Sequence, residues 1–136
     1  MQLLLDTCAA IWISADAPLA AEVLQALGRA QEEGSPVLIS PISAWEIGLL
    51  VANGRIALPT NPEAWFERLM QAPNVNLADM PPNVLIASSF LPGTPPKDPS
   101  DRIMIATARE QNLTIVTRDR RILNYAAAGH VRALAC

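Results

Sequence analysis

The chain has 136 residues, of which 51% are hydrophobic and 17% are charged, and its net charge at pH 7 is −3. This composition excludes a disordered chain, and no apolar run approaches the roughly 18 residues that span a membrane. The length fits a single globular domain over residues 1–136, with enough apolar side chains for a buried core. The first residues lack the features of a signal peptide, so we expect a cytoplasmic protein.

Segments that resemble strands and helices alternate along the chain. Short apolar runs predict buried strands at residues 3–5, 37–39, 75–77, 113–116 and 131–134. Apolar periodicity, N-cap residues and early prolines predict helices at about 9–12, 18–30, 41–53, 62–71, 83–90 and 99–111. The second of these helices is expected to start where Pro18 follows Asp16. This alternation predicts a three-layer α/β/α sandwich with a central, mostly parallel sheet.

Cysteine and histidine are scarce, which limits the metal chemistry that the chain can support. The two cysteines, Cys8 and Cys136, give little indication of a disulfide, and we expect Cys8 to be a small buried residue. The single histidine, His130, cannot by itself build a zinc site of imidazole ligands. Any metal site in this chain must therefore rely on carboxylates.

Basic residues are concentrated in the last third of the chain. Residues 97–132 contain seven of the ten basic residues and four of the thirteen acidic residues, so this segment carries a net charge of +3. Such a segment can attract phosphate groups, although a solvated basic surface explains the same pattern equally well.

Two acidic residues and one threonine follow predicted strands. Asp6 follows the first apolar run, and Thr117 and Asp119 follow the run at 113–116. Ligands of open parallel sheets bind at the carboxyl ends of the strands, so we expect these three side chains to converge. A simple capping role for Asp6 is an open alternative, and threonine and aspartate are common at strand ends in any case.

Two further acidic residues lie on the apolar stripes of predicted helices. Glu46 shares a stripe with Ile42 and Leu50, and Asp101 shares one with Met104 and other apolar residues. A buried carboxylate without a partner costs several kcal/mol, and neighbouring carboxylates raise one another's pKa. A hard divalent cation such as Mg²⁺ or Mn²⁺ relieves both effects, because it prefers oxygen ligands.

Structural explanations for these acids are also open. An ion pair with Arg102 would account for Glu46, and Asp98 with Asp101 would form a capping arrangement around Pro99. For Asp98 the helix cap is the favoured interpretation. For Asp101 the apolar stripe favours a functional role.

Four motifs follow one another along the chain: Leu-Leu-Leu-Asp-Thr at 3–7, Ser-Ala-Trp-Glu-Ile at 43–47, Asp-Pro-x-Asp-Arg-x-x-Ile-Ala-x-Ala at 98–108 and Ile-Val-Thr-Arg-Asp at 115–119. In this order they resemble the PIN-domain nucleases, and among these the VapC-type toxins of bacterial toxin–antitoxin pairs. The resemblance extends over essentially the whole chain. Two departures are Cys8, where related chains often have histidine, and the segment at 96–102, but neither removes a carboxylate.

The resemblance implies a Mg²⁺- or Mn²⁺-dependent endoribonuclease. Its acidic quartet falls on Asp6, Glu46, Asp101 and Asp119, with Thr117 as a polar helper. The metal would activate a water for in-line attack on a phosphodiester of single-stranded or looped RNA. Candidates for contacts with RNA phosphates are Arg102, Arg118, Arg120 and Arg121.

The resemblance also implies two protein partners, a cognate antitoxin and a second copy of the chain in a homodimer. The apolar, tryptophan-containing helices at 9–13 and 42–50 are candidates for these surfaces. No membrane partner is expected.

Three other classes of protein share parts of this pattern. A haloacid-dehalogenase-type phosphatase needs a second aspartate at the position of Cys8, and a receiver domain needs a late lysine, whereas the only lysine is Lys97. A PIN-like module that binds RNA or a protein without cleaving RNA is the more serious alternative. Because all four acids of the quartet are present, we favour catalysis.

Overall fold

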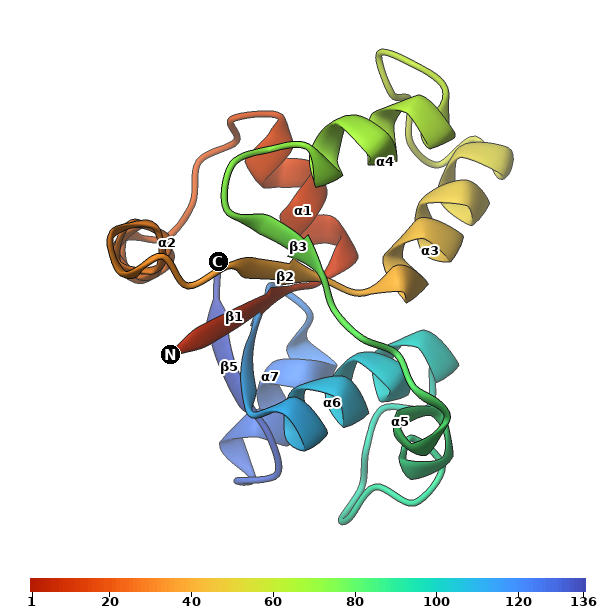
Figure 1. Ribbon diagram of the computed structural model, residues 1–136. Helices are drawn as coiled ribbons and strands as arrows, with labels where there is room; N and C mark the ends of the chain where they lie inside the picture. Colours follow the sequence, from red (N-terminus) through yellow and green to blue (C-terminus); the bar gives the residue numbers. More distant parts are fainter.

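The computed structural model describes all 136 residues, and its centre is a five-stranded sheet in the order β3-β2-β1-β4-β5 (Figure 1). Every pair of neighbouring strands is parallel. The strands are β1 (Gln2–Leu5), β2 (Val37–Ile39), β3 (Val75–Leu77), β4 (Leu113–Thr117) and β5 (Arg132–Ala135). All five predicted strands are therefore confirmed, each within about one residue of its expected bounds.

Helices cover both faces of the sheet. They are α1 (Thr7–Ser14), α2 (Ala21–Glu33), α3 (Pro41–Ala52), α4 (Pro62–Met70), α5 (Pro82–Ala87), α6 (Pro99–Gln111) and α7 (Arg120–Ala127). Figure 1 shows α1 and α4 above the sheet, α2 to its left, and α5, α6 and α7 below it. The three-layer α/β/α sandwich is confirmed. None of these helices has both the length and the apolar character needed to cross a bilayer.

The two faces of the sheet bury separate hydrophobic clusters. Along β1, Leu3 and Leu5 pack into the cluster formed with α1 and α2, whereas Leu4 packs into the cluster formed with α6 and α7. Successive side chains of a strand point to opposite faces, so an uninterrupted apolar run suits a strand that is covered on both sides.

The start of α2 was predicted wrongly. Asp16 and Pro18 predict an N-cap there, but α2 begins at Ala21 and its N-cap residue, Ala20, makes no side-chain hydrogen bond. Asp16 instead adopts a left-handed conformation with φ of 54°, which is tolerated by aspartate in turns. The predicted stop is confirmed, because Gly34 forms the C-cap with φ of 67°.

Helix α7 was not predicted at all. It begins directly after its N-cap, Asp119, and buries Ile122 and Tyr125 at a spacing of three residues. Asp119 follows a strand and also starts a helix, and aspartate is among the residues that favour the N-cap position. This helix matters for function because it fixes the positions of Asp119 and Arg121.

Candidate functional site

Two adjacent strand ends bring Asp6 and Thr117 together. The parallel register of β1 and β4 pairs Leu5 with Val116, so the next residues of both strands lie at the same edge of the sheet. The fully buried hydroxyl of Thr117 donates a hydrogen bond to Asp6 Oδ2. The same hydroxyl oxygen accepts the backbone N–H of Asp119 at 2.9 Å. Thr117 therefore connects two acids of the predicted quartet, and its role as their helper stays a prediction.

Asp6 has a structural role as well. It is the N-cap of α1, and its Oδ1 accepts the backbone N–H of Ala9 at 2.7 Å. The capping alternative is thus present together with the contact to Thr117, because each carboxylate oxygen serves a different partner. Burial raises the pKa of Asp6 above its ordinary value, although the hydrogen bonds from Thr117 and Ala9 oppose this shift.

Glu46 reaches the site from α3, which begins after the Ser40 cap and Pro41. Its Oε1 accepts a hydrogen bond of 2.6 Å from the hydroxyl of Thr7, which also hydrogen-bonds Ser43 Oγ at 2.9 Å. Thr7 and Ser43 were not assigned roles from the sequence, although both lie within the quoted motifs. The alternative ion pair between Glu46 and Arg102 does not form.

Asp98 is the N-cap of α6, as predicted. Its Oδ1 accepts the Ser100 hydroxyl at 2.6 Å and the backbone N–H of Asp101 at 3.1 Å. The hydrogen bond from Ser100 is the main cause of a lowered pKa of Asp98. Asp98 is therefore held as an anion at the start of the helix that carries Asp101.

Among these acids, Asp101 has the carboxylate with the fewest hydrogen-bond partners. Its Oδ2 is buried and accepts no hydrogen bond, and the nearest cation is Arg121, whose Nη2 lies 3.5 Å away. Burial raises the pKa of Asp101 to about 7, and the charges of Asp98 and Asp119 add to the shift. Because a buried carboxylate oxygen without a partner is unfavourable, this atom has an unused capacity to bind a cation.

Asp119 is bound to Arg121 at the start of α7. Its Oδ1 caps the helix by accepting the backbone N–H of Arg121 at 2.8 Å, and its Oδ2 lies 3.0 Å from Arg121 Nη2. Burial alone raises the pKa of Asp119, but the hydrogen bonds and charge of Arg121 outweigh burial and lower it overall.

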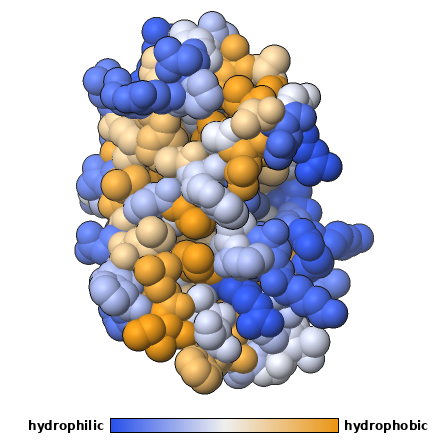
Figure 2. Space-filling view, turned by 90° about the vertical axis from the view of Figure 1, so that its right-hand side faces the viewer, coloured by the Kyte–Doolittle hydropathy of each residue, from blue (hydrophilic) through white to orange (hydrophobic).

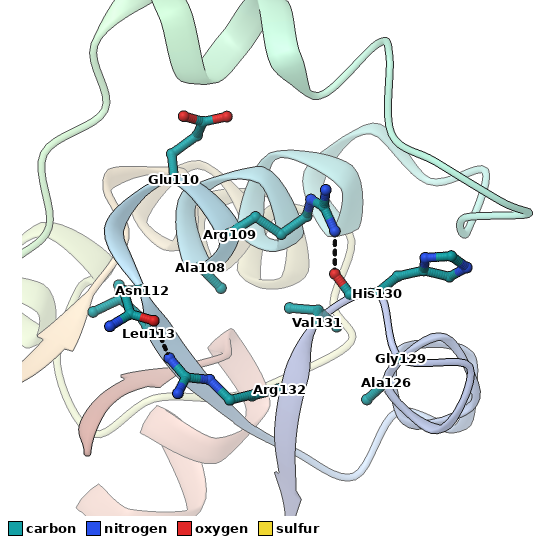
Figure 3. A pocket seen from close by; sticks show the side chains of 10 residues that line it. All are labelled: Ala108, Arg109, Glu110, Asn112, Leu113, Ala126, Gly129, His130, Val131 and Arg132. Carbon is teal, nitrogen blue, oxygen red and sulfur yellow. Dashed lines mark hydrogen bonds between the residues drawn. The ribbon is translucent and has the colours of Figure 1, made fainter.

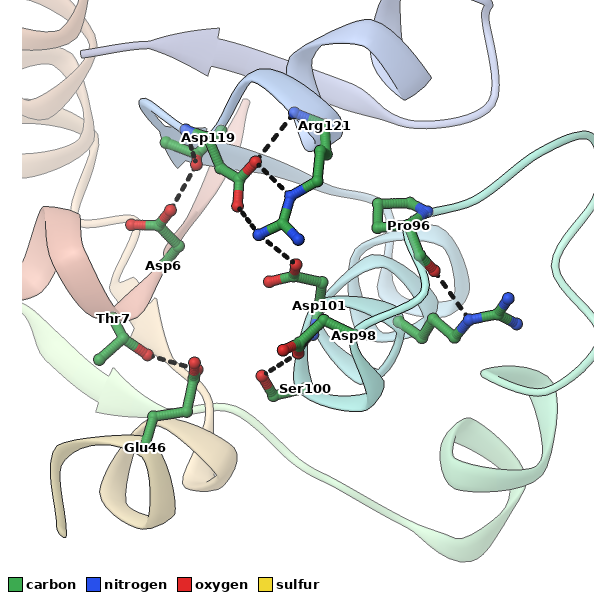
Figure 4. Close-up of polar contacts among 11 residues, drawn as sticks. Asp6, Thr7, Glu46, Pro96, Asp98, Ser100, Asp101, Asp119 and Arg121 are labelled. Atoms are coloured by element: carbon green, nitrogen blue, oxygen red, sulfur yellow. Dashed lines mark hydrogen bonds and ion pairs between the residues drawn. The ribbon is translucent and has the colours of Figure 1, made fainter. Parts of the chain in front are cut away.

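These side chains line one cleft of about 210 Å³ at the carboxyl ends of the strands (Figure 4). The residues that line the cleft are Asp6, Thr7, Cys8, Glu46, Leu50, Asp98, Asp101, Met104, Asp119, Arg121 and Ile122. The cleft contains the whole predicted quartet, although its members come from four separate parts of the chain. Cys8 was expected to be buried, but it is exposed and lines this cleft.

A larger hollow of about 510 Å³ lies at the opposite end of the sheet, where β4 and β5 begin (Figure 3). Its polar lining includes Arg109, His130 and Arg132, and its only carboxylate is Glu110. The arginines are engaged with the His130 carbonyl and the Asn112 side chain. Size alone therefore does not locate the candidate site, which is identified by the convergence of acids in the smaller cleft.

The donor chemistry of the small cleft suits a hard divalent cation. Its carboxylates supply the oxygen ligands that Mg²⁺ and Mn²⁺ prefer, and Asp101 Oδ2 is buried without a hydrogen bond. As the side chains stand, no three acidic, histidine or cysteine residues are close enough to hold one ion. A bound ion would therefore require these side chains to move closer together.

The four candidate arginines differ in their surroundings. Arg121 lines the cleft. Arg118 donates to the carbonyls of Cys136 at 2.7 Å and Pro18 at 2.8 Å, and its guanidinium carbon lies 4.0 Å from the ring centroid of Trp12. Arg102 donates to the Pro96 carbonyl at 2.8 Å, and Arg120 is exposed.

A Thr117→Val variant is expected to lower the free energy of unfolding by about 1–3 kcal/mol, because both hydrogen bonds of a buried hydroxyl are lost. The RNA cleavage that the resemblance implies should fall as well, since Asp6 loses the group that orients its Oδ2. Chemical denaturation and a cleavage assay would measure the two effects. The Thr117→Ser variant retains the hydroxyl and is the control. Equal stability of the two variants would contradict a role for this hydroxyl.

Residues 3–128 match the PIN domain family, in agreement with the parallel sheet and with the acids at its carboxyl edge. The chain therefore belongs to the PIN domain family. It is similar to Ribonuclease VapC22 of Mycobacterium tuberculosis, with 32% identity over 122 residues, which are 90% of each chain.

Solved structures agree with this fold. The chain is similar in structure to VapBC2 from Rickettsia felis bound to a promoter DNA fragment, with a TM-score of 0.70 and 13% identity over 99% of this chain and 98% of that chain. It is also similar to DNA-bound VapBC from Salmonella typhimurium, with a TM-score of 0.68 and 19% identity over the same shares. At these identities the likeness concerns the fold alone.

Proposed function

We propose that this chain is a metal-dependent endoribonuclease and the toxin of a toxin–antitoxin pair. Membership of the PIN domain family and the similarity to Ribonuclease VapC22 support this function. The observation that carries the proposal is the convergence of Asp6, Glu46, Asp101 and Asp119 on one cleft. Asp6 is buried and the other three are partly buried, and carboxylates gathered in this way repel one another unless a cation binds among them.

Asp6, Glu46 and Asp101 would hold one or two Mg²⁺ or Mn²⁺ ions directly or through water, and Asp119 would complete the site. When bound, the metal supplies an activated water and stabilises negative charge on the leaving oxygen. The protein contributes the orientation of its carboxylates. Thr117 orients Asp6, and Thr7 orients Glu46.

RNA is the proposed substrate, in a single-stranded or looped region where bases are accessible. Of the four candidate arginines, Arg121 lies in the cleft and Arg120 is exposed beside it at the start of α7, so these two are the better placed for RNA phosphates. Arg102 and Arg118 already donate to backbone carbonyls.

An antitoxin and a second copy of the chain are the proposed protein partners. The VapBC structures named above support the first of these, since each contains both members of such a pair. Apolar side chains gather in a band on the face shown in Figure 2. Exposed apolar residues include Trp45 at 55% and Leu49 at 42% on α3, and Ile86 and Phe90 in and after α5. Such residues can supply contact surfaces.

Cleavage of a cellular RNA pool by the purified protein tests the proposed function. We expect discrete cuts with Mg²⁺ or Mn²⁺ that disappear with EDTA and in an Asp6→Asn variant. Asparagine keeps an oxygen that can cap α1, so this variant should remain folded. Glu67→Gln, which changes an exposed carboxylate on α4, is the matched control. Folded protein that retains RNA on a filter without cutting it would instead support the non-catalytic binding module.

A further inference from the structure

The acidic cleft already contains a positive charge that belongs to the chain itself. Arg121 Nη2 lies 3.0 Å from Asp119 Oδ2 and 3.5 Å from Asp101 Oδ2, so its guanidinium bridges two acids of the quartet (Figure 4). Among the four candidate arginines, only Arg121 forms an ion pair. Arg121 therefore lies between two carboxylates that are proposed to share a metal ion.

The two contacts of Arg121 differ in strength. Asp119 accepts from the backbone N–H of Arg121 at 2.8 Å, from Nε at 3.3 Å and from Nη2 at 3.0 Å, so it anchors the residue. Asp101 has only the single contact at 3.5 Å, which is too long for a hydrogen bond and leaves its Oδ2 without one. The contact with Asp101 is therefore the one that breaks easily.

Because Arg121 is exposed, moving its guanidinium away from Asp101 should cost little free energy. Its side chain is 63% exposed, and ion pairs at exposed sites contribute only about 0–1 kcal/mol. A divalent ion carries twice the charge and interacts with several carboxylates at shorter distances. The ion should therefore prevail in competition with the guanidinium for Asp101.

We infer that Arg121 is a displaceable internal cation, which balances Asp101 and Asp119 in the metal-free protein and leaves Asp101 when a divalent ion binds. This inference rests on the metal dependence proposed above. After displacement, Asp119 still holds the backbone of Arg121, so the freed guanidinium stays beside the cleft. There it can donate to a phosphate of RNA, which carries the opposite charge.

Mn²⁺ titration calorimetry of the full-length protein tests the inference without measuring cleavage. An Arg121→Gln variant is expected to bind Mn²⁺ about three- to fivefold more tightly than wild type, because the ion no longer displaces a guanidinium. Arg121→Lys keeps the charge and should stay closer to wild type. Arg120→Gln removes a neighbouring positive charge that forms no ion pair with the acids, so its affinity for Mn²⁺ should change less than twofold.

Thermal unfolding provides a second readout. Without metal, Arg121→Gln should unfold at a lower temperature than wild type, since Asp101 and Asp119 lose their shared cation. Saturating Mn²⁺ should then raise its unfolding temperature by more than it raises that of wild type. The backbone N–H of residue 121, which donates to the Asp119 cap of α7, is retained in this variant, so folding should be preserved.

The possible outcomes separate this inference from the proposed function. If no variant and no wild-type protein binds Mn²⁺, the proposed metal dependence fails and the inference fails with it. If wild type binds Mn²⁺ but Arg121→Gln binds it equally or more weakly, only the role of Arg121 as a displaceable cation is overturned.

Discussion

An Asp101→Asn variant is expected to lose RNA cleavage by a factor on the order of 100 or more, while its metal-free form becomes more stable than wild type. The loss follows because a proposed metal ligand is replaced by a neutral amide. The gain in stability follows because Asp101 Oδ2 is buried without a hydrogen bond among other acids. At pH 8 with EDTA, the unfolding temperature should rise by roughly 3 °C.

Measuring both properties on the same sample separates catalysis from folding. A cleavage assay with Mg²⁺ gives the first, and a thermal scan at pH 8 with EDTA gives the second. Asp79→Asn, at an exposed carboxylate outside the cleft, is the control and should alter neither property. Full cleavage activity in Asp101→Asn would remove this residue from the ligand set. A lower unfolding temperature would show that its charge stabilises the metal-free protein.

Affinity for Mn²⁺ is expected to fall as the pH drops below 7, by about tenfold for each pH unit once the pH is well below that value, and so by about 50-fold between pH 7 and pH 5. The pKa of Asp101 in the metal-free protein is raised from 3.8 to about 7. Below that pH the ion must displace a proton from Asp101, whereas above it the carboxylate is already ionised. Calorimetry in buffers of different ionisation enthalpy should detect about one released proton per ion at pH 6 and almost none at pH 8.5.

The free energy of unfolding of the metal-free protein should depend on the same titration of Asp101, but in the opposite direction to the affinity for Mn²⁺. Between pH 3.8 and about 7 the unfolded chain has an ionised Asp101 while the folded chain keeps its proton, so unfolding releases a proton. The contribution of Asp101 to stability is therefore present at low pH and is lost as the pH rises through about 7. Asp6 acts in the same direction, because its pKa is also raised. A Mn²⁺ affinity that does not change from pH 5 to pH 7 would contradict this assignment.

Much of the fold could be predicted because its signals are local. The apolar run at β4 is buried over its whole length, and Pro99 stands at the start of α6 as its residue type suggests. Helix α7 has only eight residues, and a helix of this length is marginal without tertiary contacts. Its stability comes from burying Ile122 and Tyr125 against other elements. Its local signals, the Asp119 N-cap and the three-residue spacing of these two side chains, extend over little more than two helical turns.

The candidate site could be predicted in its residues but not in its contacts. Asp6 and Thr117 were expected to meet because parallel strands end at one edge of the sheet. The hydrogen bond from Thr7 to Glu46 joins residues 39 positions apart and depends on how α1 lies against α3. The contact from Arg121 to Asp101 depends in the same way on α7. Capping and a role in the site are not exclusive alternatives for Asp6, because a carboxylate with two oxygens can serve both.

Three helices start at the acidic cleft, since Asp6, Asp98 and Asp119 are the N-caps of α1, α6 and α7 and all line it. A helix N-terminus carries a partial charge of about +0.5 from its aligned peptide dipoles. The backbone therefore provides a fixed positive field beneath the negative side chains. This field reduces the repulsion among the carboxylates before any ion arrives. It also means that neutralising the acids would leave a cleft that attracts anions.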